Sequence, residues 1–228
     1  MKQPSDRAES EPPPAPDSAQ AVFGEALPRA VEYAELLAGE ATLRGLIGPR
    51  EVPRLWERHL LNCAVVTELI APGSTVCDIG SGAGLPGIVL AIRRPDIRVN
   101  LLEPLLRRST FLQSVVLKME LSNVVVHRGR AEDVAGTTGF EMGFDVVVSR
   151  AVAPMERLAR WSLPLTRPGG QMLAMKGSAA ADEVAHAAGA IKRAGGTDVS
   201  IHSVGEAYLD PPVTVVRVLK GRARTTTQ

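Results

Sequence analysis

Hydrophobic positions divide the chain into a helical first part and an alternating second part. Between residues 21 and 72 apolar residues recur at helical spacing, which predicts two helices, over 21–39 and 53–70, in an extension packed on the main domain. From residue 73 onward, short β-branched runs alternate with helical stretches, a pattern typical of a doubly wound parallel sheet. We expect strands near 75–79, 98–103, 123–127, 144–149, 170–175, 198–204 and 213–219, and helices near 86–93, 105–119, 154–164 and 179–194.

A short proline-containing loop separates the last two strands, so they predict an antiparallel hairpin that closes the sheet. The expected fold class is therefore α/β, with a mostly parallel sheet over residues 73–221 and the helical extension before it. Residues 1–20 are rich in Pro, Ser, Ala and Glu and predict a disordered tail. Residues 222–228 predict a short, basic and flexible tail.

The most informative feature of the composition is how charge is distributed along the chain. The 228 residues include 26 Lys or Arg and 25 Asp or Glu, a net charge of +1. Residues 1–20 hold two basic and four acidic side chains, so the remainder is more basic than the total indicates. No apolar run approaches the ~20 residues that cross a bilayer, and the polar first residues do not resemble a signal peptide. Two cysteines indicate neither a disulfide framework nor a metal site, and we expect a monomeric cytoplasmic protein without a metal.

The strongest candidate for chemistry is the glycine-rich stretch that follows the first strand of the second part. Asp78 lies near the end of that strand, and Gly80, Gly82, Gly84 and Gly87 follow before a helix begins. Glycine allows positive φ and leaves no Cβ between the backbone and a ligand. The order of strand, glycine loop and helix therefore predicts a site for a nucleotide-like cofactor.

The loop alone fits two classes of cofactor. Residues 82–87 match the dinucleotide fingerprint G-x-G-x-x-G, whereas residues 78–84 match the looser acidic loop of S-adenosylmethionine (SAM) methyltransferases. Glu103, at the end of the next strand, would bind ribose hydroxyls in either class. Methyl transfer is favoured by Glu132, which follows the third strand where methyltransferases place an acid near the adenine amino group. The Pro-Gly-Gly turn at 168–170 and the closing hairpin favour it too.

Basic residues follow the strands at their carboxyl ends, where ligands of such sheets bind. They are Arg128, Arg130, Arg150 and Lys176. Because the sulfonium of SAM is itself positive, cations beside it indicate that an anion is bound as well. That anion would be the carboxylate of the cofactor or a phosphate of nucleic acid. Arg128 and Arg130 would equally well pair with nearby acids, whereas Arg150 follows the fourth strand and should face the methyl acceptor.

The absence of motifs typical of other methyltransferase classes limits the atoms that could accept the methyl group. After the fourth strand it reads Ser149-Arg150-Ala151-Val152, unlike the [N/D]-P-P-[Y/F] motif of amino methyltransferases. Neither cysteine is expected on a loop beside the site, as carbon-5 pyrimidine methylation would require. Lys176 would supply one member of the Lys-Asp-Lys-Glu set of 2′-hydroxyl methyltransferases, without the others. A ring nitrogen such as guanine N7 needs only positioning and electrostatics, which suits a site with no obvious base.

Several stretches, in order from about residue 25 to 219, together resemble the RsmG (GidB) family of bacterial 16S ribosomal RNA guanine-N7 methyltransferases. They are Arg58-His59-Leu60-Leu61-Asn62-Cys63, residues 78–87, residues 149–154, Pro168-Gly169-Gly170 and Lys176-Gly177. The resemblance implies a Rossmann-like fold and methylation by SAM of one guanine near the decoding region of the small ribosomal subunit. It implies cofactor contacts at Gly80, Leu85, Ala131, Glu132 and Arg150, and it favours His59 and Asn62 as residues that face the site. Cys63 stands where the family would have serine.

Combining the resemblance with the motifs, we expect the catalytic residues to be Arg150, Lys176, His59 and Asn62. We expect the cofactor to contact Asp78, Gly80, Gly82, Gly84, Leu85, Glu103, Ala131, Glu132 and Arg150. Alternatives are a SAM methyltransferase for another RNA atom or a small molecule, a non-catalytic RNA-binding module, and a dehydrogenase. The intact acids and glycines of the loop argue against the module, and the closing hairpin argues against the dehydrogenase.

Overall fold

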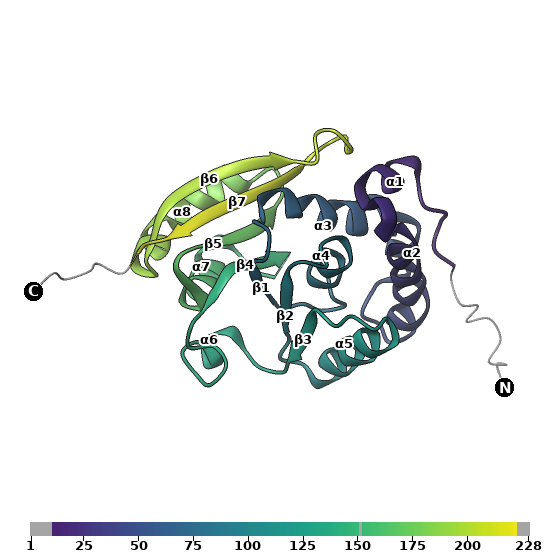
Figure 1. The fold of residues 1–228 in the computed structure, drawn as a ribbon. Coiled ribbons are helices and arrows are strands. Elements are labelled where there is room, and N and C mark those ends of the chain that lie inside the picture. Colours follow the sequence, from purple (N-terminus) through teal and green to yellow (C-terminus); the bar gives the residue numbers. More distant parts are fainter. Residues whose placement is uncertain (1–10, 151, 223–228) are drawn as a thin grey trace, which may run out of the picture.

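A computed structural model describes residues 11–150 and 152–222 of the chain. Its strands form one seven-stranded sheet in the order β3-β2-β1-β4-β5-β7-β6, with helices on both faces (Figure 1). Strands β1 to β5 are parallel, and β7 runs antiparallel between β5 and β6. The mostly parallel sheet and the closing hairpin are thus confirmed. The strands are Thr75–Ile79 (β1), Arg98–Leu102 (β2), Val124–His127 (β3), Phe144–Arg150 (β4), Thr166–Lys176 (β5), Gly196–Val204 (β6) and Val213–Lys220 (β7).

Strand β5 starts earlier than expected, because the Pro-Gly-Gly turn lies inside it. Phe144 pairs with Thr166 and Val146 pairs with Gln171, so the residues between bulge away from β4. The helices that connect the strands are Gly87–Arg93 (α4), Leu106–Lys118 (α5), Ala131–Val134 (α6), Met155–Leu165 (α7) and Ala180–Arg193 (α8). Only the short α6 has no counterpart among the expected helices.

Alternate residues of the strands build two separate cores, one on each face of the sheet. Val76 of β1 and Val148 of β4 point toward α4, α5 and the N-terminal helices. Their neighbours Cys77 and Val147 point toward α7 and α8. Both cysteines are free and buried, as expected. Within the described residues no helix is long and apolar enough to cross a bilayer.

The N-terminal helices are less regular than their hydrophobic spacing predicts. The expected helix over 21–39 is divided, because Gly24, at φ +54°, separates α1 (Asp17–Phe23) from the 3-10 turn η1 (Gly24–Ala26) and α2 (Leu27–Leu36). The expected helix over 53–70 combines 3-10, π and α turns. The remaining helical segments are η2 (Leu37–Ala41, π), η3 (Pro49–Arg54, 3-10), η4 (Leu55–Leu61, π), α3 (Asn62–Ala64) and η5 (Val65–Leu69, 3-10).

The expected disordered tail over residues 1–20 is wrong for its second half, while residues 1–10 lie outside the described residues. Helix α1 begins at Asp17, and Ala19 is fully buried. Before α1, the indole Nε1–H of Trp56 donates a hydrogen bond to the carbonyl of Pro13 at 2.9 Å. Composition conceals this contact, because a proline that looks like a linker residue accepts a hydrogen bond from an aromatic side chain of η4.

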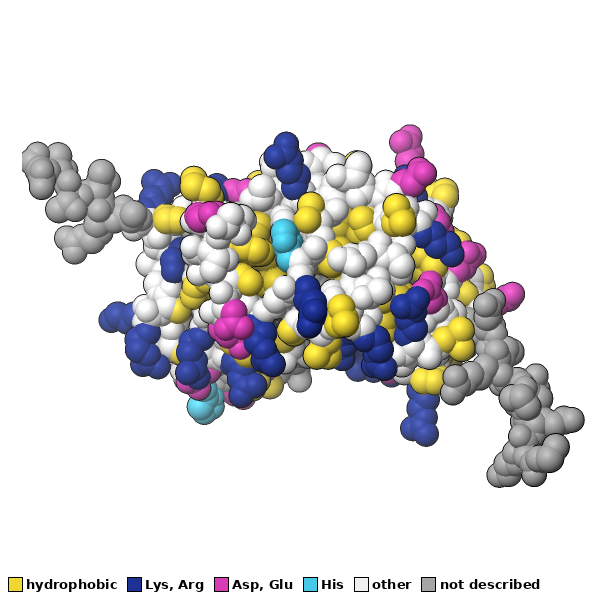
Figure 2. All heavy atoms as spheres, turned by 90° about the horizontal axis from the view of Figure 1, so that it is seen from below, with side chains coloured by type: hydrophobic (Ala, Val, Ile, Leu, Met, Phe, Trp, Pro, Cys, Tyr) yellow, Lys and Arg dark blue, Asp and Glu magenta, His cyan; other side chains and the backbone are white. Residues whose placement is uncertain are grey.

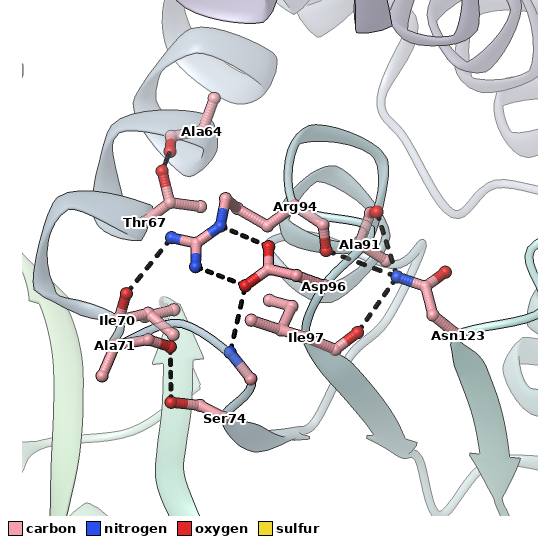
Figure 3. A network of polar contacts seen from close by, with 11 residues as sticks. Ala64, Thr67, Ile70, Ala71, Ser74, Ala91, Arg94, Asp96, Ile97 and Asn123 are labelled. Carbon is pink, nitrogen blue, oxygen red and sulfur yellow. Dashed lines mark hydrogen bonds and ion pairs between the residues drawn. The ribbon is translucent and has the colours of Figure 1, made fainter.

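At the amino ends of the strands, a polar network connects three loops (Figure 3). Arg94 pairs with Asp96 and also donates to the carbonyl of Ile70, while Asp96 accepts the backbone N–H of Gly73. The amide of Asn123 lies 3.2 Å from the carbonyls of Ala91 and Ile97. These contacts attach the end of the N-terminal helices to α4, β2 and β3, at the sheet edge opposite the glycine loop.

Deleting residues 1–20 is expected to destabilise the protein, because it removes buried Ala19, half of α1 and the acceptor of the Trp56 indole. We expect a loss on the order of 2–3 kcal/mol, or roughly 5–10 °C in the melting temperature. The matched variant is Trp56→Phe, which retains an aromatic ring beside Phe23 and loses only the hydrogen bond, about 1 kcal/mol. Differential scanning calorimetry measures both. A truncated chain that melts like the full chain would show that this contact contributes nothing.

Candidate active site

The glycine loop is held by two buried carboxyl groups from neighbouring strands. Asp78 in β1 accepts the backbone N–H of Gly87 at 3.0 Å. Glu103, directly after β2, accepts the N–H of Gly82 at 2.9 Å through one oxygen and the N–H of Leu105 at 3.0 Å through the other. Glu103 is only 1% exposed. Because each oxygen has a second lone pair, Glu103 retains acceptor capacity toward a ligand.

Asp78 has one oxygen without any partner. Its side chain is fully buried, and Oδ1 makes no hydrogen bond in the structure. Burial raises the pKa of Asp78 from its usual 3.8 to about 7, against the hydrogen bond from the backbone N–H of Gly87, which favours the charged form. An unpaired buried carboxyl oxygen is costly, so its position beside the loop indicates a place for a donor from a ligand.

The glycines of the loop serve different purposes. A Cβ on Gly82 would meet nothing closer than a backbone oxygen at 3.8 Å, which leaves open space on that side. A Cβ on Gly84 would instead lie 2.7 Å from the hydroxyl of Tyr33 and 2.5 Å from Ile88. Gly84 was expected to approach the cofactor, but its lack of a side chain is explained by close packing against protein atoms.

Tyr33 connects the N-terminal helices to the glycine loop. It lies in α2, is fully buried, and donates its hydroxyl hydrogen to the carbonyl of Ala83 at 2.6 Å. Burial raises the pKa of Tyr33 well above its usual 10, so the hydroxyl keeps the proton that it donates. The sequence analysis missed this residue. The only signal was a tyrosine on the apolar face of a helix, whose hydroxyl needs a partner when buried.

Arg150, at the end of β4, is surrounded by residues of η4 and α3. Its Nη2 lies 2.8 Å from Nδ1 of His59 and donates to the carbonyl of Arg58 at 3.1 Å. Its Nη1 donates to the sulfur of Cys63 at 3.6 Å. Burial raises the pKa of the Cys63 thiol to about 11, so it stays protonated despite the adjacent guanidinium. The structure thus brings together Arg150 and His59, two of the expected site residues, and adds Cys63, which was not among them.

Asn62 and Lys176 lie apart from this cluster. Asn62 lines a groove of about 430 Å³ between the helix surface around Arg58 and the β6–β7 loop around Tyr208. Lys176 donates to Glu183 of α8 at 2.7 Å and to the carbonyl of Ala153 at 2.9 Å. The Lys176 amine is thus directed at protein acceptors on α8 and on the segment before α7.

The remaining expected cofactor residues lie along the same edge of the sheet. Gly80 donates its N–H to the carbonyl of Leu102, and Leu85 packs on the core beneath the loop. Ala131 is buried at the start of α6, whereas Glu132 is exposed, 3.9 Å from Arg130. Among the described residues, no group of three His, Cys, Asp or Glu side chains would hold a metal ion.

A family model described as "rRNA small subunit methyltransferase G" (GidB) matches residues 26–211. The chain belongs to the GidB family. It is 56% identical over 211 residues to the ribosomal RNA small subunit methyltransferase G of Streptomyces avermitilis, covering 92% of this chain and 87% of that protein. It is 53% identical over 220 residues to the protein of the same name from Mycolicibacterium vanbaalenii, covering 94% of both. The resemblance noted in the sequence is therefore confirmed.

Solved structures of proteins with low sequence identity to this chain show the same fold. The apo form of the S-adenosylmethionine-dependent methyltransferase SibL is similar with a TM-score of 0.57 at 20% identity, over 90% of this chain and 70% of that one. Fibrillarin from Aeropyrum pernix, solved with natively bound S-adenosyl-L-methionine, has a TM-score of 0.50 at 19% identity, over 71% and 74%. At such identities the similarity establishes the methyltransferase fold alone.

The unpaired oxygen of Asp78 leads to a test of stability against pH. Because its pKa is raised, the folded chain keeps a proton that the unfolded chain has released, and unfolding becomes easier as pH rises from about 4 to about 7. Asp78→Asn removes this slope. Relative to the wild type, the variant should gain on the order of 2 kcal/mol in unfolding free energy between pH 5 and pH 8. Urea denaturation at pH 5 and pH 8 measures the unfolding free energies, and Asp182→Asn, at an exposed position, is the control. If the difference between Asp78→Asn and the wild type were the same at both pH values, the burial argument would be contradicted.

Gly82 and Gly73 provide a matched pair for the loop. Both have positive φ, +59° and +71°, and neither has side-chain atoms near the place of a Cβ. Alanine should therefore strain each backbone alike, by about 1–2 kcal/mol. Only Gly82→Ala should lower SAM affinity, by tenfold or more, because its methyl group would enter the open side of the loop. Isothermal titration calorimetry measures the SAM affinity of each variant. Equal affinities of Gly82→Ala and Gly73→Ala would show that the cofactor does not bind against this side of the loop.

Proposed function

We propose that this protein transfers the methyl group of SAM to N7 of one guanine in the 16S rRNA of the small ribosomal subunit. The observation that carries the proposal is the match to the GidB family over residues 26–211, with both carboxyl groups and all glycines of the loop present. Acting on the small subunit, the protein would work in the bacterial cytoplasm, as a monomer and without a metal.

The residues of the loop fit SAM. The unpaired oxygen of Asp78 suits a positively charged amino group, and the free lone pairs of Glu103 suit the hydroxyls of a ribose. Gly82 leaves open space on one side of the loop, and Ala131 and Glu132 would recognise the adenine of the cofactor. When bound, SAM supplies an electrophilic methyl group on a sulfonium, and the protein has to orient the acceptor and exclude water.

The chemistry of the site suits a ring nitrogen as acceptor. Guanine N7 has a free lone pair, so no side chain has to remove a proton before attack. A reaction that needs no base or nucleophile agrees with two features of the site. Lys176 is already paired with Glu183, and the raised pKa of Cys63 keeps its thiol from becoming a thiolate. Because N7 becomes positive as it accepts the methyl group, Arg150 would act through an anion, either the cofactor carboxylate or an RNA phosphate.

Exposed arginines around this edge would bind the RNA backbone. Arg58 precedes His59, Arg107 lies in the first turn of α5, and Arg128 and Arg130 follow β3; all four are exposed. Figure 2 shows Lys and Arg side chains gathered along one margin of the underside of the molecule. Arginines that contact phosphate add affinity without reading sequence, so binding to RNA should weaken steeply with salt.

The direct test is to map N7-methylguanine in 16S rRNA from cells with and without this protein. We expect one guanine to lose its modification in the deletion strain and to regain it when purified 30S subunits are incubated with SAM and the protein. Arg150→Lys and Arg150→Ala should both lower the rate at least tenfold with little change in melting temperature, because lysine lacks the planar fork. An unchanged methylation map would contradict the proposal. Methylation of a different atom would support the alternative RNA methyltransferase.

A further inference from the structure

A chain of polar contacts leads from Arg150 away from the glycine loop into the N-terminal helices. The ring of His59 lies between two charged groups, with Nδ1 2.8 Å from Nη2 of Arg150 and Nε2 2.8 Å from Oε2 of Glu51. Glu51 belongs to η3 and His59 to the π-helical turn η4. His59 is only 8% exposed, so the contact with the guanidinium is largely shielded from water.

The chemistry of the two partners determines where the imidazole proton lies. Guanidinium nitrogens donate and do not accept, so Nδ1 of His59 must be the acceptor in its contact with Arg150. The proton of the neutral ring is then on Nε2, which donates to the carboxylate of Glu51. Arg150 thus determines the tautomer, and Glu51 favours the same tautomer and orients the ring, in the way that a carboxylate orients the histidine of a metal site or a catalytic triad.

Protonation of His59 would break this arrangement. An imidazolium carries hydrogen on both nitrogens, so Nδ1–H would point at the donors of Arg150, and two positive charges would lie within hydrogen-bonding distance. Two more groups face the ring region: Arg58, which reaches Glu51 at 3.4 Å, and Cys63, whose neutral thiol contacts Arg150. Neither would compensate, because one is a further cation and the other is uncharged.

We propose that Glu51 and neutral His59 are positioning residues that hold the Arg150 guanidinium in the orientation needed for methyl transfer. This inference rests on the proposed function for its effect on rate, whereas the proton arrangement stands on geometry alone. His59 itself exchanges no proton with the substrate. Glu51 has no role in the motif on which the resemblance rests, and nothing in the sequence distinguishes it from other surface acids.

The arrangement has a direct consequence for pH dependence. Burial lowers the pKa of His59 below its ordinary 6.5, the charge of Arg150 lowers it further, and the bond to Glu51 partly opposes both. The ring therefore stays neutral at pH 7, and the active arrangement is lost only as pH falls through this lowered pKa. Methyl transfer should accordingly show an acid limb that belongs to His59.

The experiment compares His59→Phe and His59→Asn with the wild type. Phenylalanine removes the acceptor for Arg150, whereas the amide oxygen of asparagine replaces Nδ1 as acceptor and does not titrate. We expect His59→Phe to lower the single-turnover rate on 30S subunits at least tenfold, measured with SAM at saturation. His59→Asn should recover most of the rate at pH 8 and should lose the acid limb. Glu51→Gln should slow the reaction several-fold and shift that limb.

Matched controls are His186→Asn, an exposed histidine of α8, and Glu40→Gln, an acid paired with Arg44 on the remote surface of the N-terminal helices. Both should behave as wild type. A wild-type rate in His59→Phe, or an acid limb that persists in His59→Asn, would overturn the positioning role.

Nitrogen NMR of the His59 ring tests the proton arrangement without any activity. We expect a neutral ring with hydrogen on Nε2 at pH 7, and a weaker hydrogen bond at Nε2 in Glu51→Gln, because a neutral amide oxygen accepts less strongly than a carboxylate. A ring protonated at pH 7, or one with hydrogen on Nδ1, would overturn the inference. Because this signal does not depend on the substrate, failure of the inference is distinguishable from failure of the proposed methylation.

Discussion

Burying a carboxyl group is costly unless it accepts hydrogen bonds, and the loop after β1 is built around that constraint. Two adjacent strands each contribute one acid, and each acid holds one backbone N–H of the loop. Asp78 fixes the end where α4 begins, and Glu103 fixes the middle at Gly82. The close approach of α4 to the sheet follows, because a Cβ on Gly87 would lie 2.8 Å from Oδ2 of Asp78. The unpaired Oδ1 is what remains for a ligand.

Features that depend on neighbours in sequence could be predicted from the sequence. The β-branched runs gave the strands to within a few residues, and the glycines with their flanking acids gave the place of the loop. Contacts between distant segments could not be predicted, because no local pattern marks them. The pairing of Tyr33 with Ala83 spans 50 residues, and that of His59 with Arg150 spans 91. The proline-rich composition around Pro13 predicted disorder, yet its carbonyl accepts a hydrogen bond from a tryptophan 43 residues away.

Arg150 and Lys176 show how two residues with the same expected position come to have different surroundings. Both follow a parallel strand, so both were expected at the carboxyl edge beside a ligand. The difference lies in partners that strand position does not reveal. Glu183, on α8, lies 2.7 Å from the Lys176 amine, whereas Arg150 meets a carbonyl, a thiol and a neutral imidazole. The arginine therefore keeps an uncompensated charge at the site, and the lysine does not.

The hydroxyl of Tyr33 supports the glycine loop from a segment far away in the chain. Helix α2 therefore helps to fix the shape of the loop, although it carries none of the loop's glycines or acids. In genetic terms, inactivating alleles should occur in the first seventy residues as well as in the glycine motif. If the N-terminal helices were exchanged between relatives, the glycine loop that they support would have to be exchanged with them.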